Sequence, residues 1–246
     1  MTSIFRTAFA RLADICWPRV CQVRSCGRPV DRPNRHLCSR CLADMPWLEG
    51  GGTCRVCGAP IPAEAPHDFT CDSCRDLKPA FEFARAGLRY AEPAATLLKD
   101  FKFRGALWLR EDLTDILEAT VRAKLEWQAI DAVFPVPLYF MRRVKRGYNQ
   151  SAILARCLAA RLNRRFDASS LVRNRDTEHQ TRLSGKDARL KNIESAFSVR
   201  RPEFVRGRTI LLVDDVMTTG ATLNECAKPL VEAGASRVWC ATVARR

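Results

Sequence analysis

The sequence predicts an α/β fold in which helices flank a parallel sheet, preceded by a small cysteine-rich domain. From about residue 81, apolar runs typical of buried strands alternate with stretches whose apolar residues recur every three or four positions, as in helices. Nine of the 12 cysteines lie between Cys16 and Cys74. We therefore predict two domains, one over residues 1–80 and the other over residues 81–246.

The composition is that of a folded and strongly basic protein. The chain has 246 residues, of which 47% are hydrophobic, so it can bury a proper core. Its formal net charge of +14 indicates a polyanionic ligand or partner. No apolar run approaches the ~20 residues that span a bilayer, so we expect no membrane span and a cytoplasmic location. Residues 1–15 have the pattern of an amphipathic helix, which we expect to pack as a cap on the segment that follows.

The cysteine-rich front is a tandem repeat. The segment at 26–30 is echoed at 57–61, and the segment at 38–46 is echoed at 71–79, with offsets of 31 and 33 residues. We find no export signal, and in such a chain close cysteine pairs favour metal thiolates over disulfides. A segment of roughly 60 residues with few large apolar side chains also needs a bound metal or a cross-link to fold stably.

Each copy of the repeat predicts one tetrahedral zinc site, because two facing pairs of cysteines supply the four thiolates that Zn²⁺ binds. The predicted ligands are Cys21, Cys26, Cys38 and Cys41 in the first site, and Cys54, Cys57, Cys71 and Cys74 in the second. Cys16 is an alternative to Cys21. Either His36 or His67 could be recruited as a ligand, although a solvated imidazole is the simpler interpretation of each. We expect the zinc to be structural.

The elements of the second domain follow from its apolar patterns. Strands are predicted at 84–90, 132–136, 197–199, 209–213 and 238–243, and helices at 93–101, 107–127, 151–162 and from about 222 to 234. Alternation of this kind implies a parallel sheet covered by helices on both faces. Ligands of such sheets bind beyond the carboxyl ends of the strands, so the loops after residues 136 and 213 are the places to expect a site.

The most informative stretch runs from Ile210 to Thr222. An aliphatic run ends in Asp214 and Asp215, and a short Thr/Gly loop then leads into the next helix. Backbone N–H groups at a helix start, together with threonine hydroxyls, can surround a phosphate, and two adjacent carboxylates suit the vicinal hydroxyls of a sugar. The loop therefore predicts a site for a ribose 5-phosphate. Its phosphate-binding residues would be Met217, Thr218, Thr219, Gly220, Ala221 and Thr222.

Two basic segments are candidates for further ligand contacts. Eight Arg or Lys residues and no acidic residue lie between Tyr139 and Phe166, and guanidinium groups bind phosphate oxygens in pairs. If the strand at 132–136 lies beside the strand at 209–213, the loop after it faces the two carboxylates. The cluster in this loop comprises Arg142, Arg143, Lys145 and Arg146. The polar segment 177–192 suits a mobile lid. Its candidate contacts are Arg182, Lys186 and Arg189, and His179 is a possible general base or a solvated side chain.

The stretch from Ile210 to Thr222 resembles the signature with which type I phosphoribosyltransferases bind 5-phosphoribosyl-1-pyrophosphate (PRPP). Along nearly its whole length, the chain resembles the bacterial ComF family of competence-associated phosphoribosyltransferase-like proteins. The supporting segments lie at 101–105, 135–138, 146–150, 180–184 and 192–197. The resemblance implies a type I phosphoribosyltransferase-like fold, a double zinc ribbon in front of it, and a link to the uptake of transforming single-stranded DNA.

The same resemblance implies a role for each candidate group. Pyrophosphate would leave C1 of PRPP through an oxocarbenium-like transition state. Asp214 and Asp215 would hold the ribose hydroxyls, the basic loop would bind pyrophosphate, and a Mg²⁺ ion would bridge the two. The acceptor would lie under a variable hood built by residues 81–105, which do not reveal its identity.

Two functions stay open at this point. The first is transfer of phosphoribosyl to an acceptor with release of pyrophosphate. The second is a non-catalytic accessory protein that binds single-stranded DNA, interacts with DNA-uptake proteins and uses the PRPP-binding fold to sense PRPP. Aromatic residues near basic ones would favour the second function, because bases stack on them, although aromatic residues at such spacings more often belong to a core. These aromatic residues are Phe101, Phe103, Trp108, Tyr139 and Tyr148. PRPP sites are themselves basic, so charge alone does not separate the two functions.

Overall fold

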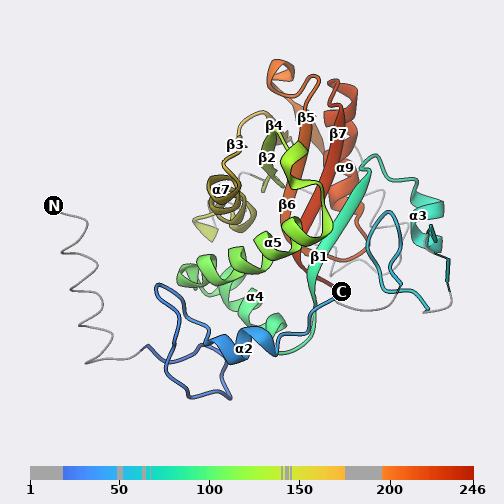
Figure 1. Cartoon of the computed structure of the whole chain (residues 1–246). Helices are drawn as coiled ribbons and strands as arrows, with labels where there is room; N and C mark the ends of the chain where they lie inside the picture. Colours follow the sequence, from blue (N-terminus) through green and yellow to red (C-terminus); the bar gives the residue numbers. More distant parts are fainter. Residues whose placement is uncertain are drawn as a thin grey trace.

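The computed structural model describes residues 19–48, 52–62, 65–66, 68–139, 141, 144, 146–174 and 196–246. Its centre is a five-stranded parallel sheet with the strand order β1-β7-β6-β2-β3 (Figure 1). The strands are β1 (Phe83–Arg89), β2 (Ala132–Pro135), β3 (Arg165–Phe166), β6 (Thr209–Met217) and β7 (Arg237–Arg245). The predicted α/β class is confirmed. β2 and β6 are neighbours, as the predicted site requires.

Helices cover both faces of the sheet. α5 and α7 pack on one face and α9 packs on the other. Leu211 and Val213 of β6 join the core that contains α5 and α7, whereas Ile210 and Leu212 join the core that contains α9. This division follows from the strand geometry, because successive side chains point to opposite faces. The bounds are Ala94–Phe103 for α4, Arg110–Lys124 for α5, Gln150–Leu162 for α7 and Ala221–Glu232 for α9.

Two predicted elements differ in how they are divided or paired. The helix predicted at 107–127 is divided into η1 (Leu107–Leu109), α5 and η2 (Trp127–Ala129). The strand at 197–199 exists as β5 (Phe197–Val199), but it pairs antiparallel with β4 (Leu171–Arg173) and not with the parallel sheet. A three-residue strand such as β4 is too short to show a period in the sequence.

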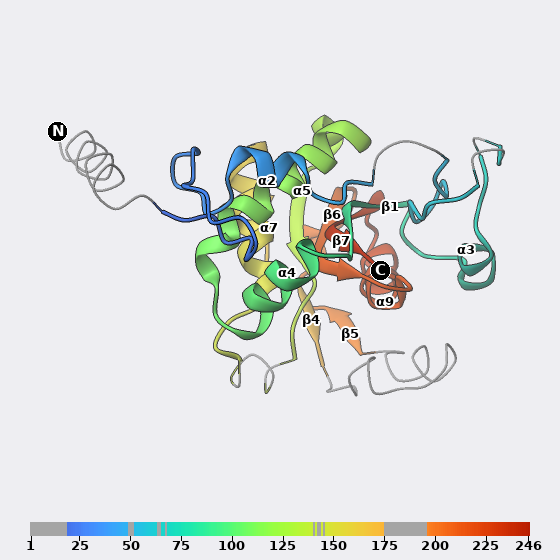
Figure 2. The same cartoon turned by 90° about the horizontal axis from the view of Figure 1, so that it is seen from below.

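The two cysteine-rich copies pack on opposite faces of the sheet. Cys21 and Leu37 of the first copy are buried in the core with α5 and α7, whereas Cys54 and Cys74 of the second copy are buried in the core with α9. Figure 2 shows the result: α2 lies beside α5 and α7, and α3 lies on the side of α9. Their bounds are Ser39–Ala43 for α2 and Asp72–Leu77 for α3.

Buried charges fix the first copy to α5. The fully buried carboxylate of Asp112 accepts hydrogen bonds from the backbone N–H groups of His36 at 2.9 Å and Leu37 at 3.2 Å. Asp115 accepts from the guanidinium of Arg35 at 2.7 and 2.9 Å. Because a buried carboxylate is costly unless it is paired, these contacts hold the loop that precedes α2 in one place.

Three predictions about the outer parts of the chain have different outcomes. Among the described residues, no helix is long and apolar enough to cross a membrane. The helix predicted at 1–15 lies outside the described residues. The domain boundary near residue 80 stays a prediction.

Candidate functional site

The two adjacent carboxylates lie where β6 loses one of its neighbours. β2 pairs with β6 only as far as Pro135 and Val213, whereas β7 continues beside β6 as far as Met217. The prediction that the strand ends before Asp214 is therefore wrong, because pairing with β7 extends it past both carboxylates. Asp214 and Asp215 therefore lie where β6 has no β2 partner, at the carboxyl edge of the sheet, the edge at which ligands of such folds bind. Asp214 is partly exposed there, whereas Asp215 is buried.

Lys102, at the end of α4, lies against the second carboxylate. Its Nζ is 3.1 Å from Oδ1 and 2.8 Å from Oδ2 of Asp215, although only the contact to Oδ1 has the geometry of a hydrogen bond. Burial alone would raise the pKa of Asp215, but the ammonium of Lys102 outweighs it and holds that pKa below its usual range. Burial would lower the pKa of Lys102, but the charges of Asp215 and Asp214 raise it. The pair is therefore ionised.

Asp214 has a different environment. Its Oδ1 accepts a hydrogen bond from the hydroxyl of Ser151 at 2.7 Å and another from the backbone N–H of Asp215 at 2.9 Å. Burial, followed by the charge of Asp215, raises the pKa of Asp214 to about 7. Two adjacent carboxyl groups with separated pKa values are typical of functional sites.

The turn after β6 has the backbone of an anion-binding loop. Gly220 adopts a left-handed conformation, with φ of 82°, and forms the N-cap of α9. Beyond it, the first N–H groups of a 12-residue helix face the carboxyl edge, where a helix start favours negative charge. A side chain at position 220 would be strained by this φ, and its Cβ would meet Phe81 and Met217 at 3.7 Å. The residues predicted to hold a phosphate, 217–222, thus run from the last residue of β6 through the turn at 218–220 into the first two residues of α9.

The basic loop after β2 is described only in part. Arg142, Arg143 and Lys145 lie outside the described residues. Arg146 donates a hydrogen bond to Gln150 Oε1 at 2.7 Å, and its guanidinium carbon lies 5.1 Å from the centre of the Phe103 ring. Since Lys102 precedes Phe103 and contacts Asp215, Phe103 connects the basic loop with the two carboxylates.

The end of α4 is also bonded directly to this loop. The hydroxyl of Tyr148 donates to the backbone carbonyl of Phe101 at 2.6 Å. Asn149 caps α7 through the backbone N–H groups of Ser151 and Ala152, and its own amide donates to Val136. The segments 101–105 and 146–150, distant in sequence, therefore meet beside Asp214 and Asp215.

The remaining candidates are placed as follows. The predicted lid residues Arg182, Lys186 and Arg189, together with His179, lie outside the described residues. Among the proposed base-stacking aromatics, Phe101 is fully buried and cannot stack on a base, so that prediction is wrong. Phe103 and Trp108 are 63% and 47% exposed.

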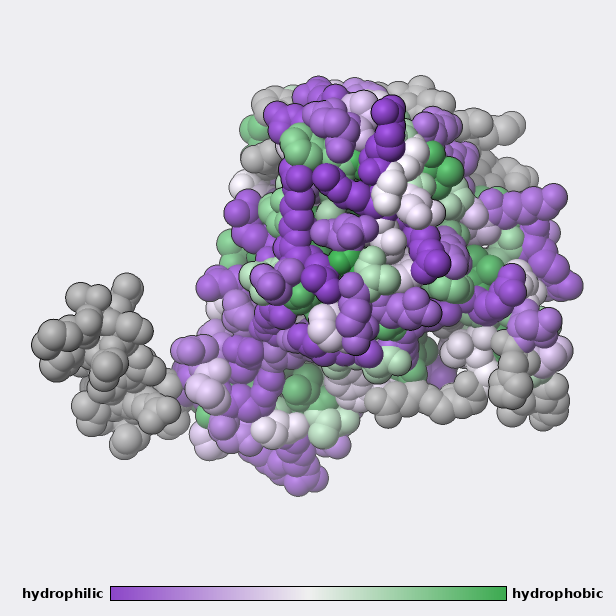
Figure 3. All heavy atoms as spheres, turned by 45° about the horizontal axis from the view of Figure 1, so that its top comes forward, coloured by the Kyte–Doolittle hydropathy of each residue, from purple (hydrophilic) through white to green (hydrophobic). Residues whose placement is uncertain are grey.

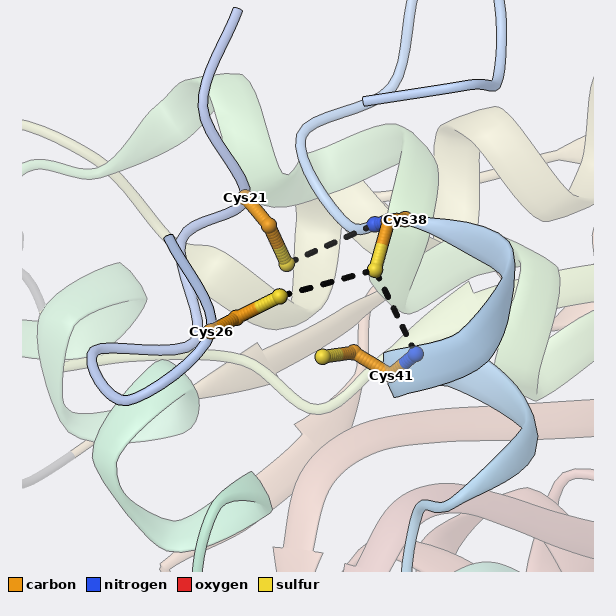
Figure 4. A group of neighbouring side chains, drawn as sticks. All are labelled: Cys21, Cys26, Cys38 and Cys41. Carbon is orange, nitrogen blue, oxygen red and sulfur yellow. Dashed lines mark hydrogen bonds between the residues drawn. The ribbon is translucent and has the colours of Figure 1, made fainter. Parts of the chain in front are cut away.

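Four cysteines of the first copy converge on one point (Figure 4). The sulfur atoms of Cys21, Cys26, Cys38 and Cys41 all lie within 4.8 Å of one another. A zinc ion with bonds of about 2.3 Å to four sulfurs would hold them about 3.8 Å apart. The Cys26 and Cys38 sulfurs are 3.8 Å apart. The backbone N–H of Cys38 also points at Cys21 Sγ, at 3.4 Å, as suits a thiolate.

The second copy repeats this arrangement. The sulfur atoms of Cys54, Cys57, Cys71 and Cys74 also lie within 4.8 Å of one another. The Cys57 and Cys71 sulfurs are 3.7 Å apart, and the Cys71 N–H points at Cys54 Sγ. Both sets of four cysteines fit a tetrahedral zinc ion, so each copy can hold one.

Of the three alternative zinc ligands, only His36 lies in the part of the chain that the structure describes. His36 lies beside the first group but is not a member of it, and its Nδ1 faces Asp112 at 3.9 Å. Burial lowers the pKa of His36. The imidazole is half-buried against α5, so its interpretation as a solvated surface group is wrong. Cys16 and His67 lie outside the described residues.

We expect purified protein to contain about two zinc ions per chain. The fit of both cysteine groups to a tetrahedral ion is the reason. Elemental analysis by mass spectrometry measures the ratio after extensive dialysis against metal-free buffer. A ratio below about one would contradict the assignment of the two groups as zinc sites.

Two residues of the site, Lys102 and Ser151, were not predicted from the sequence. Lys102 belongs to a segment that carried the family resemblance, but nothing in its local pattern indicates that it reaches Asp215, 113 positions away. Ser151 resembles any residue at the start of a helix. Only the packing of α4 and α7 against the end of β6 reveals their place. The one available signal was the position of Lys102 between two aromatic residues near a glycine.

Comparison with known proteins identifies the fold of the second part of the chain and its relatives. Residues 129–246 match the family model described as the phosphoribosyl transferase domain. Competence protein F of Haemophilus influenzae is 35% identical over 210 residues, which cover 82% of this chain and 87% of that protein. DNA utilization protein YhgH of Escherichia coli O6:H1 is 34% identical over 231 residues, covering 92% of this chain and 95% of that protein.

A similarity to solved structures is slighter. A chain described as the allosteric regulatory enzyme of purine biosynthesis aligns with a TM-score of 0.37 and 22% identity. The alignment covers 54% of this chain and 25% of the other. The fold assignment therefore rests on the order of the parallel strands and on the match to the phosphoribosyl transferase domain.

Proposed function

The chain belongs to the ComF family of phosphoribosyltransferase-like proteins, and from this premise we propose that it binds PRPP with Mg²⁺ in a process linked to DNA uptake. One observation carries the proposal. Asp214 and Asp215 lie side by side at the open carboxyl edge, followed at once by the turn at 217–222. Carboxylates for a diol and N–H groups for a phosphate are thus adjacent, as a ribose 5-phosphate requires.

The residues would share the work as follows. Asp214 and Asp215 would accept hydrogen bonds from the ribose hydroxyls and would offset positive charge that develops on the sugar ring. The turn at 217–222 would surround the 5-phosphate. Arg146 would face the pyrophosphate, with Arg142, Arg143 and Lys145 as further candidates and with Arg182, Lys186 and Arg189 as lid contacts. Mg²⁺, when bound with PRPP, would neutralise part of the pyrophosphate charge.

The reaction that this site would support is transfer of phosphoribosyl. A nucleophile would form a bond to C1 of the ribose, the bond from C1 to the pyrophosphate oxygen would break, and its electron pair would leave with pyrophosphate. The nucleophile would lose its proton to solvent. Phe103, which is exposed beside Lys102, would lie where the acceptor enters.

The experiment that tests the proposal combines binding with turnover. Calorimetry with PRPP and Mg²⁺ measures binding, and release of pyrophosphate in the presence of pooled bases, amines and oligonucleotides measures transfer. Binding with release identifies a transferase. Binding without release from any pool favours a sensor, and the absence of binding contradicts the proposal.

The second candidate function is that of a non-catalytic accessory protein for single-stranded DNA. The net charge of +14 favours it, since a single PRPP site accounts for few of these charges. The relatives named for DNA utilization and competence support it as well. The two functions are compatible, because PRPP binding at one place can gate DNA handling at another.

We expect the affinity for PRPP to fall as the pH decreases through about 7. The pKa of Asp214 is raised to about 7, so below that pH its carboxyl group is protonated and can no longer accept from a ribose hydroxyl as an anion. The loss should approach tenfold per pH unit. Calorimetric titration with PRPP and Mg²⁺ from about pH 6 to pH 8.5 measures it.

Lys102→Met separates this effect from the ionisation of PRPP itself. Without the ammonium of Lys102, the pKa values of both carboxyl groups should increase, and the pH at which affinity falls should move upward. PRPP titrates identically with both proteins. An identical pH profile for the variant and the natural chain would show that the carboxyl groups do not control binding.

A further inference from the structure

A cluster of arginines surrounds Phe204 at the edge of the sheet opposite the PRPP site. The guanidinium carbon of Arg165 lies 3.9 Å from the centre of the Phe204 ring, and those of Arg201 and Arg208 each lie 6.0 Å from it. Arg208 also donates a hydrogen bond to the backbone carbonyl of Phe204 at 2.7 Å. The ring belongs to a short turn, η3 (Pro202–Phe204), and is half-buried.

The strand register places this cluster at the amino edge of the sheet. Arg165 is the first residue of β3 and pairs with Ala132, the first residue of β2. Arg208 directly precedes β6. Because all five strands are parallel, these residues lie at the opposite end from Asp214 and Asp215. Figure 3, which brings the top of Figure 1 forward, shows mostly hydrophilic residues over that end.

The cluster continues along the edge towards η2. The guanidinium carbon of Arg164 lies 6.0 Å from the centre of the Trp127 ring, and its Nη2 donates to the carbonyl of Gln128 at 2.9 Å. We define the arginine surface by Arg164, Arg165, Arg201 and Arg208 with the rings of Trp127 and Phe204. Its two rings contact the adjacent residues Arg164 and Arg165, and Trp127 packs against the core that contains α5 and α7.

The charges of the arginine surface are not neutralised by nearby acids. In the part of the chain that the structure describes, none of its four arginines forms an ion pair with Asp or Glu. Arg161 is the contrast, since it contacts Glu111 at 2.5 Å, Asp115 at 2.7 Å and Glu118 at 3.2 Å. Guanidinium groups gathered without acids repel one another, and a bound polyanion relieves that repulsion.

We propose that the arginine surface binds single-stranded nucleic acid. Guanidinium groups bind phosphodiester oxygens, and several of them together suit a chain of phosphates better than a single phosphate. Unpaired bases would stack on the guanidinium planes and on the exposed parts of the two half-buried rings, and basic groups beside aromatic ones are typical of proteins that bind single strands. The proposal deepens the second candidate function by giving it a location, and it does not depend on PRPP binding.

The test compares two sets of substitutions that remove the same charge. Arg165→Gln, Arg201→Gln and Arg208→Gln are combined in one variant; glutamine keeps a donor for the Phe204 carbonyl. The control variant combines Arg28→Gln, Arg40→Gln and Arg89→Gln, which are exposed residues outside the arginine surface. Fluorescence anisotropy with a labelled oligothymidylate of about 30 nucleotides measures affinity over a range of salt concentrations.

We expect the first variant to lose at least about tenfold in affinity and its salt slope to decrease by about 2, whereas the control stays within about threefold. Equal losses in both variants would overturn the proposal, as would absence of binding by the natural chain. Duplex DNA or inorganic polyphosphate that competes as well as the single strand would also overturn it, because the surface would then bind any polyanion.

Two further measurements keep the test decisive. If the triple variant unfolds at a lower temperature, the double variant Arg165→Gln with Arg201→Gln spares the hydrogen bond of Arg208 and should still lose about two thirds of the salt slope that the triple variant loses. PRPP binding by the triple variant should equal that of the natural chain. The arginine variant should lose DNA binding and keep PRPP binding. A variant of Asp214 and Asp215 should lose PRPP binding and keep DNA binding. Failure of this proposal can therefore be distinguished from failure of the proposed function.

Discussion

Asparagine at both positions 214 and 215 is expected to abolish binding of PRPP with Mg²⁺ while the chain stays folded. Each substitution keeps the shape of the side chain and removes the negative charge that a ribose hydroxyl would meet. A hydrogen bond to a charged group contributes about 1.5–3 kcal/mol, so two of them correspond to roughly 10²- to 10⁴-fold in affinity. Calorimetry would then detect no heat of binding at PRPP concentrations that saturate the natural chain.

The control for this prediction is a pair of substitutions with the same charge change. Asp44→Asn with Asp68→Asn alters two exposed carboxylates outside the site and should leave the affinity unchanged. The double variant at 214 and 215 should still show a cooperative thermal transition, although Lys102 loses its partner. Unchanged PRPP affinity in that variant would remove the assignment of the site.

The parallel fold could be predicted because its signals are local. The run from Ile210 to Val213 is continuous and aliphatic, as strands buried on both faces are, and the helices carry their period over several turns. The two cysteine groups could be predicted for the same reason, since ligand spacing and repetition are properties of the sequence alone. The alternation of strands and helices predicted a parallel sheet, but the pairing of the strands at 132–136 and 209–213 was only a condition of the predicted site until the structure showed it.

The contacts that complete the site could not be predicted in this way. Lys102 reaches Asp215 only because α4 ends beside the open edge of β6, and Ser151 reaches Asp214 only because Asn149 begins α7 at that point. Such contacts depend on tertiary packing, which short-range sequence patterns do not indicate. The arginine surface has the same origin, because Arg165 and Arg201 come from segments that are separated in sequence and joined only by the edge of the sheet.

The two cysteine groups differ in what they contact, although they repeat in sequence. In the second copy, the carbonyl of Cys57 accepts a hydrogen bond from Arg245 at 2.8 Å, and the same guanidinium lies 3.9 Å from the sulfur of Met217. The segment after this copy also contacts the turn proposed to bind phosphate, since Phe81 packs near Gly220. The first copy is bonded instead to Asp112 of α5, away from the turn.

Loss of the second zinc should therefore weaken PRPP binding, whereas loss of the first should not. Cys57→Ser and Cys26→Ser are matched variants, because the two cysteines occupy equivalent positions in the repeat. Each should retain about one zinc per chain and unfold at a lower temperature, since zinc binding to four thiolates contributes ~10–16 kcal/mol in small zinc domains.

The two variants should then separate in calorimetry with PRPP and Mg²⁺, well below either unfolding temperature. We expect Cys57→Ser to lose on the order of tenfold in affinity, the scale of loss when a positioning contact is removed, and Cys26→Ser to remain within about threefold of the natural chain. The physical reason is that Arg245 joins the Cys57 carbonyl to Met217, so a movement of the cysteine loop around Cys57 would displace the turn that is proposed to bind phosphate. Equal losses would mean that the zinc groups act only through overall stability.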